Sequence, residues 1–123
     1  MNNWDGVEKR KHPRHSIDIG VELRILDDWE KHLIGYHGHT KDVSLGGICV
    51  KLPRYKAAAY PGIKEKRRLQ VRIPVLDIKE YLELNGEIAW CLQKGKDCNI
   101  GIQFIENDKE REESLSKFVE SIK

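Results

Sequence analysis

Hydrophobic residues fall at every second position over much of this chain, and the clearest run lies near its N-terminus. The apolar members of that run are Ile17, Ile19, Val21, Leu23 and Ile25. A period of two places alternate side chains on one face of a strand, whereas a helix would scatter them around its axis. We therefore predict a strand with one face in a core and the other in water.

The same alternation recurs along the chain and predicts a series of short strands. Residues 33–43 are a weaker candidate, because Gly35 and Gly38 interrupt the pattern. The other predicted strands span residues 48–52, 69–75, 82–92 and 100–104. Turns are expected at 27–31, 44–47 and 94–97, and residues 54–67 are expected to form a connection that includes a short helical turn.

Proline and glycine modify three of these strands. Pro74 has no N–H to donate, so its strand is expected to lie at a sheet edge or to end there. Gly86 predicts a kink, with inward alternation continuing beyond it through Trp90 and Leu92. This alternation favours Trp90 as a core residue, and the alternative is that Trp90 lines a ligand site. Gly101 is interpreted either as a bulge residue or as one that leaves room for a ligand.

Only the C-terminal segment has the period of a helix. Leu115, Phe118, Val119 and Ile122 share one helical face, and Asn107 or Asp108 supplies the N-cap. Short strands followed by one amphipathic helix predict an all-β fold with one C-terminal helix, built on a six-stranded antiparallel barrel. The predicted organisation is a flexible arm at 1–14, a barrel at 15–106 and a helix at 107–123.

Charge is balanced overall but unevenly placed. The 22 basic and 20 acidic residues give a formal net charge of +2, which says little about a partner. Four cations, however, lie close together before the first strand: Lys9, Arg10, Lys11 and Arg14. This concentration favours a compact anionic ligand.

The three cysteines, Cys49, Cys91 and Cys98, cannot all pair with one another, and none forms a C-x-x-C motif. We interpret them as small core residues. The sequence shows neither a secretory leader pattern nor an apolar run long enough for a membrane span. The expectation is a reduced, cytoplasmic protein that does not insert into a membrane.

Two short motifs combine residue types that suit anion binding. Arg10 and Arg14 form an R-x-x-x-R pair, and arginine offers paired donors that match phosphate or the edge of guanine. Asp42, Ser44 and Gly47 form a D-x-S-x-x-G at a predicted turn. The carboxylate can accept from a guanine, and the serine can donate to a phosphate or hold the turn. Gly46 and Gly47 would allow close backbone approach and positive φ.

An arginine pair before the first strand, followed by D-x-S-x-x-G, resembles the PilZ domain family of bacterial cyclic di-GMP receptors. The resemblance extends through 86–90 and 101–104 to the closing helix. It implies that Arg10 and Arg14 contact phosphates and guanines, and that Asp42, Ser44, Gly46 and Gly47 form the opposite wall. Lys9, just before the pair, is implied to influence whether one ligand or a stacked pair binds, and the stoichiometry stays open.

The resemblance further implies a non-enzymatic receptor with cyclic di-GMP as ligand and no cofactor. Its arm would fold onto the barrel when the ligand binds and signal to another protein, with self-association left open. Motility and exopolysaccharide production are the processes that the family suggests. The partner itself is not identified by the sequence.

Three alternatives to this interpretation arise from the residues. A small basic barrel can bind single-stranded nucleic acid, but the aromatics here do not form an obvious stacking platform. Ser44 has no evident general base, which argues against an enzyme. His37 and His39 share a strand face without a third ligand at metal-site spacing, so no metal site is expected.

Overall fold

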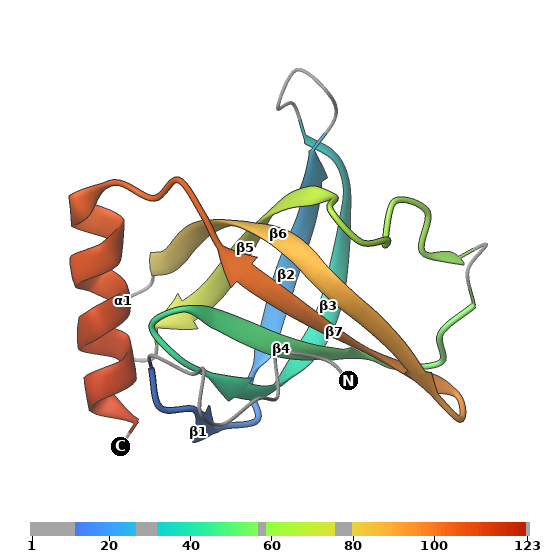
Figure 1. Ribbon diagram of the computed structural model, residues 1–123, viewed down its shortest axis with the longest axis horizontal. Helices are drawn as coiled ribbons and strands as arrows, with labels where there is room; N and C mark the ends of the chain where they lie inside the picture. The colour runs from blue at the N-terminus through green and yellow to red at the C-terminus, as the bar shows by residue number, and fades with distance from the viewer. Residues whose placement is uncertain (1–11, 27–31, 57–58, 76–79, 123) are drawn as a thin grey trace.

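The computed structural model describes residues 12–26, 32–56, 59–75 and 80–122. Lys9, Arg10 and the turn predicted at 27–31 lie outside the described residues. Backbone hydrogen bonding defines six long antiparallel strands that close into a barrel (Figure 1). They are β2 (Gly20–Leu26), β3 (His32–Val43), β4 (Gly47–Leu52), β5 (Arg68–Val75), β6 (Glu80–Lys94) and β7 (Asp97–Phe104).

Around the barrel the strands follow the order β2, β3, β4, β7, β6 and β5, and β5 pairs with β2 to close the ring. A short strand, β1 (His15–Ser16), pairs with β3 outside this ring. Closure gives each long strand two neighbours and removes the exposed edges that an open sheet would have. The predicted six-stranded barrel is confirmed.

The predicted alternation fills the barrel interior. Val21, Leu23 and Ile25 on β2 are 3% exposed or less, while Glu22 and Arg24 between them face outward. The same pattern on β5 buries Leu69, Val71 and Ile73 completely. Burying one such side chain contributes about 1.5–3 kcal/mol, so the alternating face supplies most of the driving force for closure.

Of the two outcomes expected at Pro74, the strand end is confirmed and the sheet edge is wrong. β5 lies between β2 and β6, and it ends at Val75. Pairing with β2 stops at Arg72, which pairs with Glu22, so Pro74 lies beyond that ladder. The barrel therefore tolerates its missing N–H, and β5 ends one residue later at Val75.

At Gly86, where a kink is expected, β6 runs unbroken and keeps its register with β5. A Cβ at Gly86 would lie 2.6 Å from Ile102 Cγ2, so glycine here permits close packing. The pairing with β7 shifts instead between Ile88 and Trp90, where one extra residue forms a bulge. The bulge reverses the alternation and turns Trp90 outward, half-buried, while Leu92 is 51% exposed.

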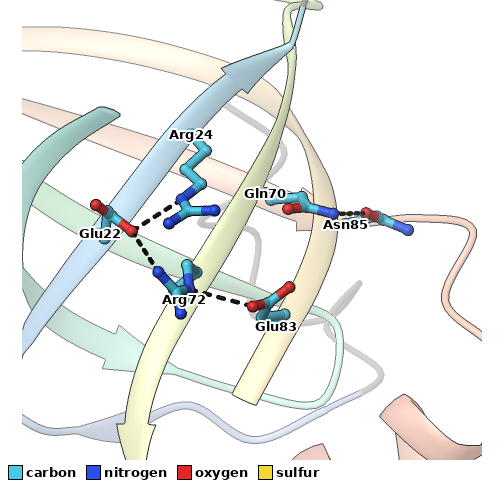
Figure 2. A network of polar contacts seen from close by, with 6 residues as sticks. All are labelled: Glu22, Arg24, Gln70, Arg72, Glu83 and Asn85. Atoms are coloured by element: carbon cyan, nitrogen blue, oxygen red, sulfur yellow. Dashed lines mark hydrogen bonds and ion pairs between the residues drawn. The ribbon is translucent and has the colours of Figure 1, made fainter. Parts of the chain in front are cut away.

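A network of charged side chains covers the outside of β2, β5 and β6 (Figure 2). Arg24 Nε and Arg72 Nη1 donate to Glu22 Oε1 over 2.9 and 3.0 Å, and Arg72 Nε lies 3.2 Å from Glu83 Oε1. Partial burial would raise the pKa of Glu22, but the hydrogen bonds from the two arginines outweigh it and lower that pKa. The cations of this face are matched by its own carboxylates, so a free anion has little reason to bind there.

The C-terminal helix, α1 (Lys109–Ser121), packs beside one end of the barrel (Figure 1). Of the two predicted caps, Asp108 is the one used, and its Oδ1 accepts from Arg111 N over 2.9 Å. Leu115 and Val119 are buried against the barrel as predicted. Within the described part of the chain, no helix has the length and apolar character needed to cross a membrane.

The prediction that the cysteines are core residues is confirmed at Cys98, which is 2% exposed. Cys49 is also buried, at 5% exposure, but it lies on the outer face of β4 and outside the core. Cys91 is exposed, so its prediction as a core residue is wrong. Cys91 lies on the hairpin formed by β6 and β7, after the bulge at which the alternation of inward and outward side chains changes.

Candidate ligand-binding surface

Strand β1 brings the end of the arm to the turn between β3 and β4. His15 pairs with Val43 and Ser16 pairs with Asp42, so the antiparallel register places Arg14 beside the start of that turn. Residues 17–19 then connect β1 to β2. Ile17 N donates to Lys41 O over 3.3 Å, which continues the contact with β3.

Thr40 on β3 fixes this connection from inside. Its side chain is only 3% exposed, accepts from Ile19 N over 3.0 Å, and donates to Ile17 O. Thr40 N also donates to Ile19 O over 2.9 Å. Because a buried hydroxyl without such partners would be costly, these bonds hold the chain on β3 just after Arg14.

Arg14 and Asp42, from the two predicted motifs, lie side by side. Arg14 Nη1 is 3.8 Å from Asp42 Oδ2, which is within ion-pair range but longer than a hydrogen bond. Their side chains are 13% and 23% exposed, so both reach solvent. The structure therefore brings one arginine of R-x-x-x-R to the carboxylate of D-x-S-x-x-G.

Ser44 holds the turn. Its side chain is 5% exposed, and its Oγ accepts from the backbone N–H groups of Gly46 and Gly47 over 3.1 and 3.2 Å. Ser44 N donates to Gly47 O over 2.9 Å and closes the turn. Of the two roles predicted for this serine, the structural one is the role seen here.

The prediction that Gly46 and Gly47 use positive φ is wrong, because among the described glycines only Gly62 and Gly95 have it. Gly46 instead permits a close approach, since a Cβ there would lie 3.2 Å from His12 Cδ2. The arm thus packs against the turn already at His12. A Cβ at position 46 would require the exposed His12 ring to move by a few tenths of an ångström.

Strand pairing extends the site across the outside of the barrel. Starting from Asp42, the outward-facing cross-strand neighbours are Cys49 on β4, Gly101 on β7 and Trp90 on β6. We call Asp42, Cys49, Gly101 and Trp90 the ligand row. Adjacent strands are about 4.8 Å apart, so the three steps of the row span about 14 Å.

At the far end of the ligand row, the Trp90 ring lies directly on Gly101. A Cβ at Gly101 would be 2.2 Å from both Nε1 and Cε2 of the indole. Of the two interpretations of Gly101, the bulge residue is wrong, because the extra residue is on β6. The glycine leaves room for the Trp90 ring. A usable signal was present, since a ring covering a glycine on the neighbouring strand is a recurrent sheet pairing.

The candidate surface is an open face of the barrel and not a cavity. A cavity of about 830 Å³ does exist between α1 and the end of the barrel. It is lined by Ile17, Val75, Phe118 and Ile122 among others, and by none of the predicted ligand residues. In the described ranges, no group of three His, Cys, Asp or Glu side chains is placed to hold a metal.

A closed six-stranded barrel that carries an arginine and an acidic turn together on its outer face defines a known class of small domain. The family model for the PilZ domain matches residues 8–121. The chain therefore belongs to the PilZ domain family. A comparison with curated protein sequences finds no match.

Solved structures share this fold. The PilZ domain of YcgR from Escherichia coli, determined with cyclic di-GMP, matches with a TM-score of 0.69 at 15% identity, covering 93% of this chain and 91% of that one. The PilZ domain of CeSA from a cellulose-synthesizing bacterium matches at 0.62 and 25% identity, covering 89% and 96%. The complex of MrkH from K. pneumonia with cyclic di-GMP matches at 0.67 and 12%, covering 94% of this chain and 52% of MrkH.

Proposed function

We propose that this chain is a non-catalytic receptor for cyclic di-GMP, which binds on the outer face of β3, β4 and β7. The observation that supports the proposal most is the juxtaposition of Arg14 and Asp42, one from each motif. Guanidinium donors suit the phosphates and the Hoogsteen edge of guanine, and a carboxylate suits its N1 and N2 hydrogens. One cyclic dinucleotide presents all of these groups. Membership of the PilZ family and the ligand present in the YcgR and MrkH structures support the same assignment.

Each residue of the proposed site has a distinct task. Arg10 and Arg14 bind phosphates and guanines, Lys9 adds charge beside them, and Asp42 accepts from a base. Ser44 fixes the turn by accepting from the N–H groups of Gly46 and Gly47. A fixed turn keeps the Asp42 carboxylate in position on the outer face.

Trp90 extends the proposed site beyond the two motifs. Its indole is half-buried on the outer face and lies on Gly101, where it could offer a ring face for stacking. Stacking on an aromatic ring contributes about 1–3 kcal/mol per base. A guanine on Trp90 would leave the phosphates over β4, within reach of the arm.

Signalling follows from the arm in this proposal. Arg10 and Arg14 gain phosphate partners when the ligand arrives, which orders the arm over the turn at an entropic cost that the charged hydrogen bonds offset. The newly formed surface acts on another protein or on a second copy of the chain. Regulation of motility or exopolysaccharide production in the cytoplasm is the context that the family suggests.

Isothermal titration calorimetry tests the proposal. We expect saturable binding of cyclic di-GMP with micromolar or lower Kd, and binding of a single-stranded oligonucleotide that is at least tenfold weaker at the same salt concentration. Matched salt matters because contacts to phosphate weaken as ionic strength rises. An absence of heat with cyclic di-GMP would refute the proposal, and tighter binding of the oligonucleotide would favour the nucleic-acid alternative.

Intact cyclic di-GMP after prolonged incubation is the expected result if the chain has no catalytic activity.

A further inference from the structure

Beside the ligand row runs a second outward-facing set of cross-strand neighbours, formed by His39, Lys51, Asn99 and Leu92. Asn99 is unusual in this position because it is only 6% exposed, although it faces outward. Its Oδ1 is buried and has no hydrogen-bond partner among the described residues. A buried carboxamide oxygen without a partner destabilises the state in which it occurs.

Trp90 has the complementary defect. Its Nε1 is also buried, with no hydrogen-bond partner in the part of the chain that the structure describes, and the indole nitrogen can only donate. Trp90 pairs with Gly101, and Leu92 pairs with Asn99, so Trp90 and Asn99 are diagonal neighbours on the same face. Diagonal neighbours in an antiparallel pair lie about 7–8 Å apart, within reach of an aromatic side chain. A buried donor and a buried acceptor thus lie next to each other without bonding.

We propose that Asn99 is a positioning residue for Trp90: when the ligand binds, the indole shifts on Gly101 and donates its Nε1–H to Asn99 Oδ1. The shift satisfies both groups at once and orients the ring as a platform for a guanine. This inference rests on the proposed function and deepens it, because it gives the site a ligand-linked rearrangement. Cyclic di-GMP would then favour the shifted indole by stacking on it, which is the differential contact that a change of state requires.

The proposal predicts that one variant keeps or gains stability but loses affinity for cyclic di-GMP. Asn99→Leu keeps the branched shape of the side chain but removes the unsatisfied oxygen, so the ligand-free protein should have an unchanged or higher Tm. The same change removes the acceptor for the indole, so the Kd for cyclic di-GMP should rise about three- to tenfold. A residue with a purely structural role would lose stability and affinity together.

A double-mutant cycle isolates the proposed contact. Trp90→Phe keeps an aromatic ring but has no N–H, so it should raise the Kd by itself, and Asn99→Leu should then have no further effect. Gln93→Leu, which removes an exposed amide from the same hairpin, is the matched control and should bind as the wild type does. Calorimetry with cyclic di-GMP gives the affinities, and thermal unfolding without ligand gives the stabilities.

The outcomes separate this inference from the function on which it rests. The inference is wrong, and the receptor function stands, if Asn99→Leu binds cyclic di-GMP as tightly as the wild type does. The same holds if Asn99→Leu raises the Kd by the same factor in the Trp90→Phe background as in the wild type. If Asn99→Leu fails to fold, Trp90→Phe alone decides, since unchanged affinity there contradicts a role for the indole N–H. If the wild type binds no cyclic di-GMP, the function and the inference fail together.

Discussion

Replacing Arg14 by alanine is expected to weaken binding of cyclic di-GMP by about tenfold to more than a hundredfold. Each charge-assisted hydrogen bond to phosphate or guanine contributes about 1.5–3 kcal/mol, which corresponds to that range in Kd. Arg14 is 13% exposed and lies 3.8 Å from Asp42, so it is already placed beside the site. Calorimetric titration of the variant with the dinucleotide measures the effect.

Two further arginine variants show whether this loss is specific. Arg14→Lys keeps the charge but loses the planar pair of donors, so it should recover only part of the affinity. Arg24→Ala, on the opposite outer face, removes an arginine that is bound to Glu22 and should leave binding unchanged. Equal losses in Arg14→Ala and Arg24→Ala would mean that the arginines act through net charge alone, against the site described here.

Gly101→Ala is expected to destabilise the protein by about 1–3 kcal/mol and to impair ligand binding as well, because the new methyl group overpacks the surface. Its Cβ would lie 2.2 Å from two atoms of the Trp90 ring, which must move off β7. The variant therefore removes the stacking platform without changing any polar ligand of the site. Thermal or denaturant unfolding measures the first effect and calorimetry the second.

A matched glycine and a double variant serve as controls for Gly101→Ala. A Cβ at Gly20 has nothing within 4 Å, so Gly20→Ala should leave both stability and affinity close to those of the wild type. In a Trp90→Ala background the clash is gone, and Gly101→Ala should then cost little. An undiminished destabilisation in that background would show that the glycine is needed for some reason other than the indole.

The strands could be predicted from the sequence because their determinants are local. Val21, Leu23 and Ile25 alternate with polar residues, and the barrel buries them as that pattern requires. Asp108 likewise caps α1 through its own side chain and the next turn of backbone. Such features depend on residues that are close together in the chain, so they can be recognised without the fold.

The irregularities could not be predicted in this way, because neighbours in space decide them. The bulge after Ile88 depends on how β6 pairs with β7, and it reverses the orientation of Trp90 and Leu92. Pro74 is tolerated in an internal strand because the partner ladder on β2 ends before it. The local pattern of hydrophobic residues indicates neither the bulge nor the end of the β2 ladder.

The candidate site was predictable in its residue types but not in its extent. Residues and spacing identified the two motifs, and the resemblance to PilZ domains linked them. The structure adds the contact of Arg14 with Asp42 and the contribution of Trp90 through Gly101. The alternation favours Trp90 as a core residue because it does not account for the extra residue in the bulge. The outward orientation of Trp90 extends the candidate surface from the turn to β6.

Mapping the ligand by two-dimensional NMR tests the central claim most directly. On titration with cyclic di-GMP, the largest shifts should fall on the backbone amides of Asp42, Gly46, Gly47 and Gly101 and on the indole N–H of Trp90. Residues of the cavity beside α1, such as Phe118 and Ile122, should shift little. Shifts concentrated on that cavity, or a ligand row that does not respond while the dinucleotide binds, would contradict the account.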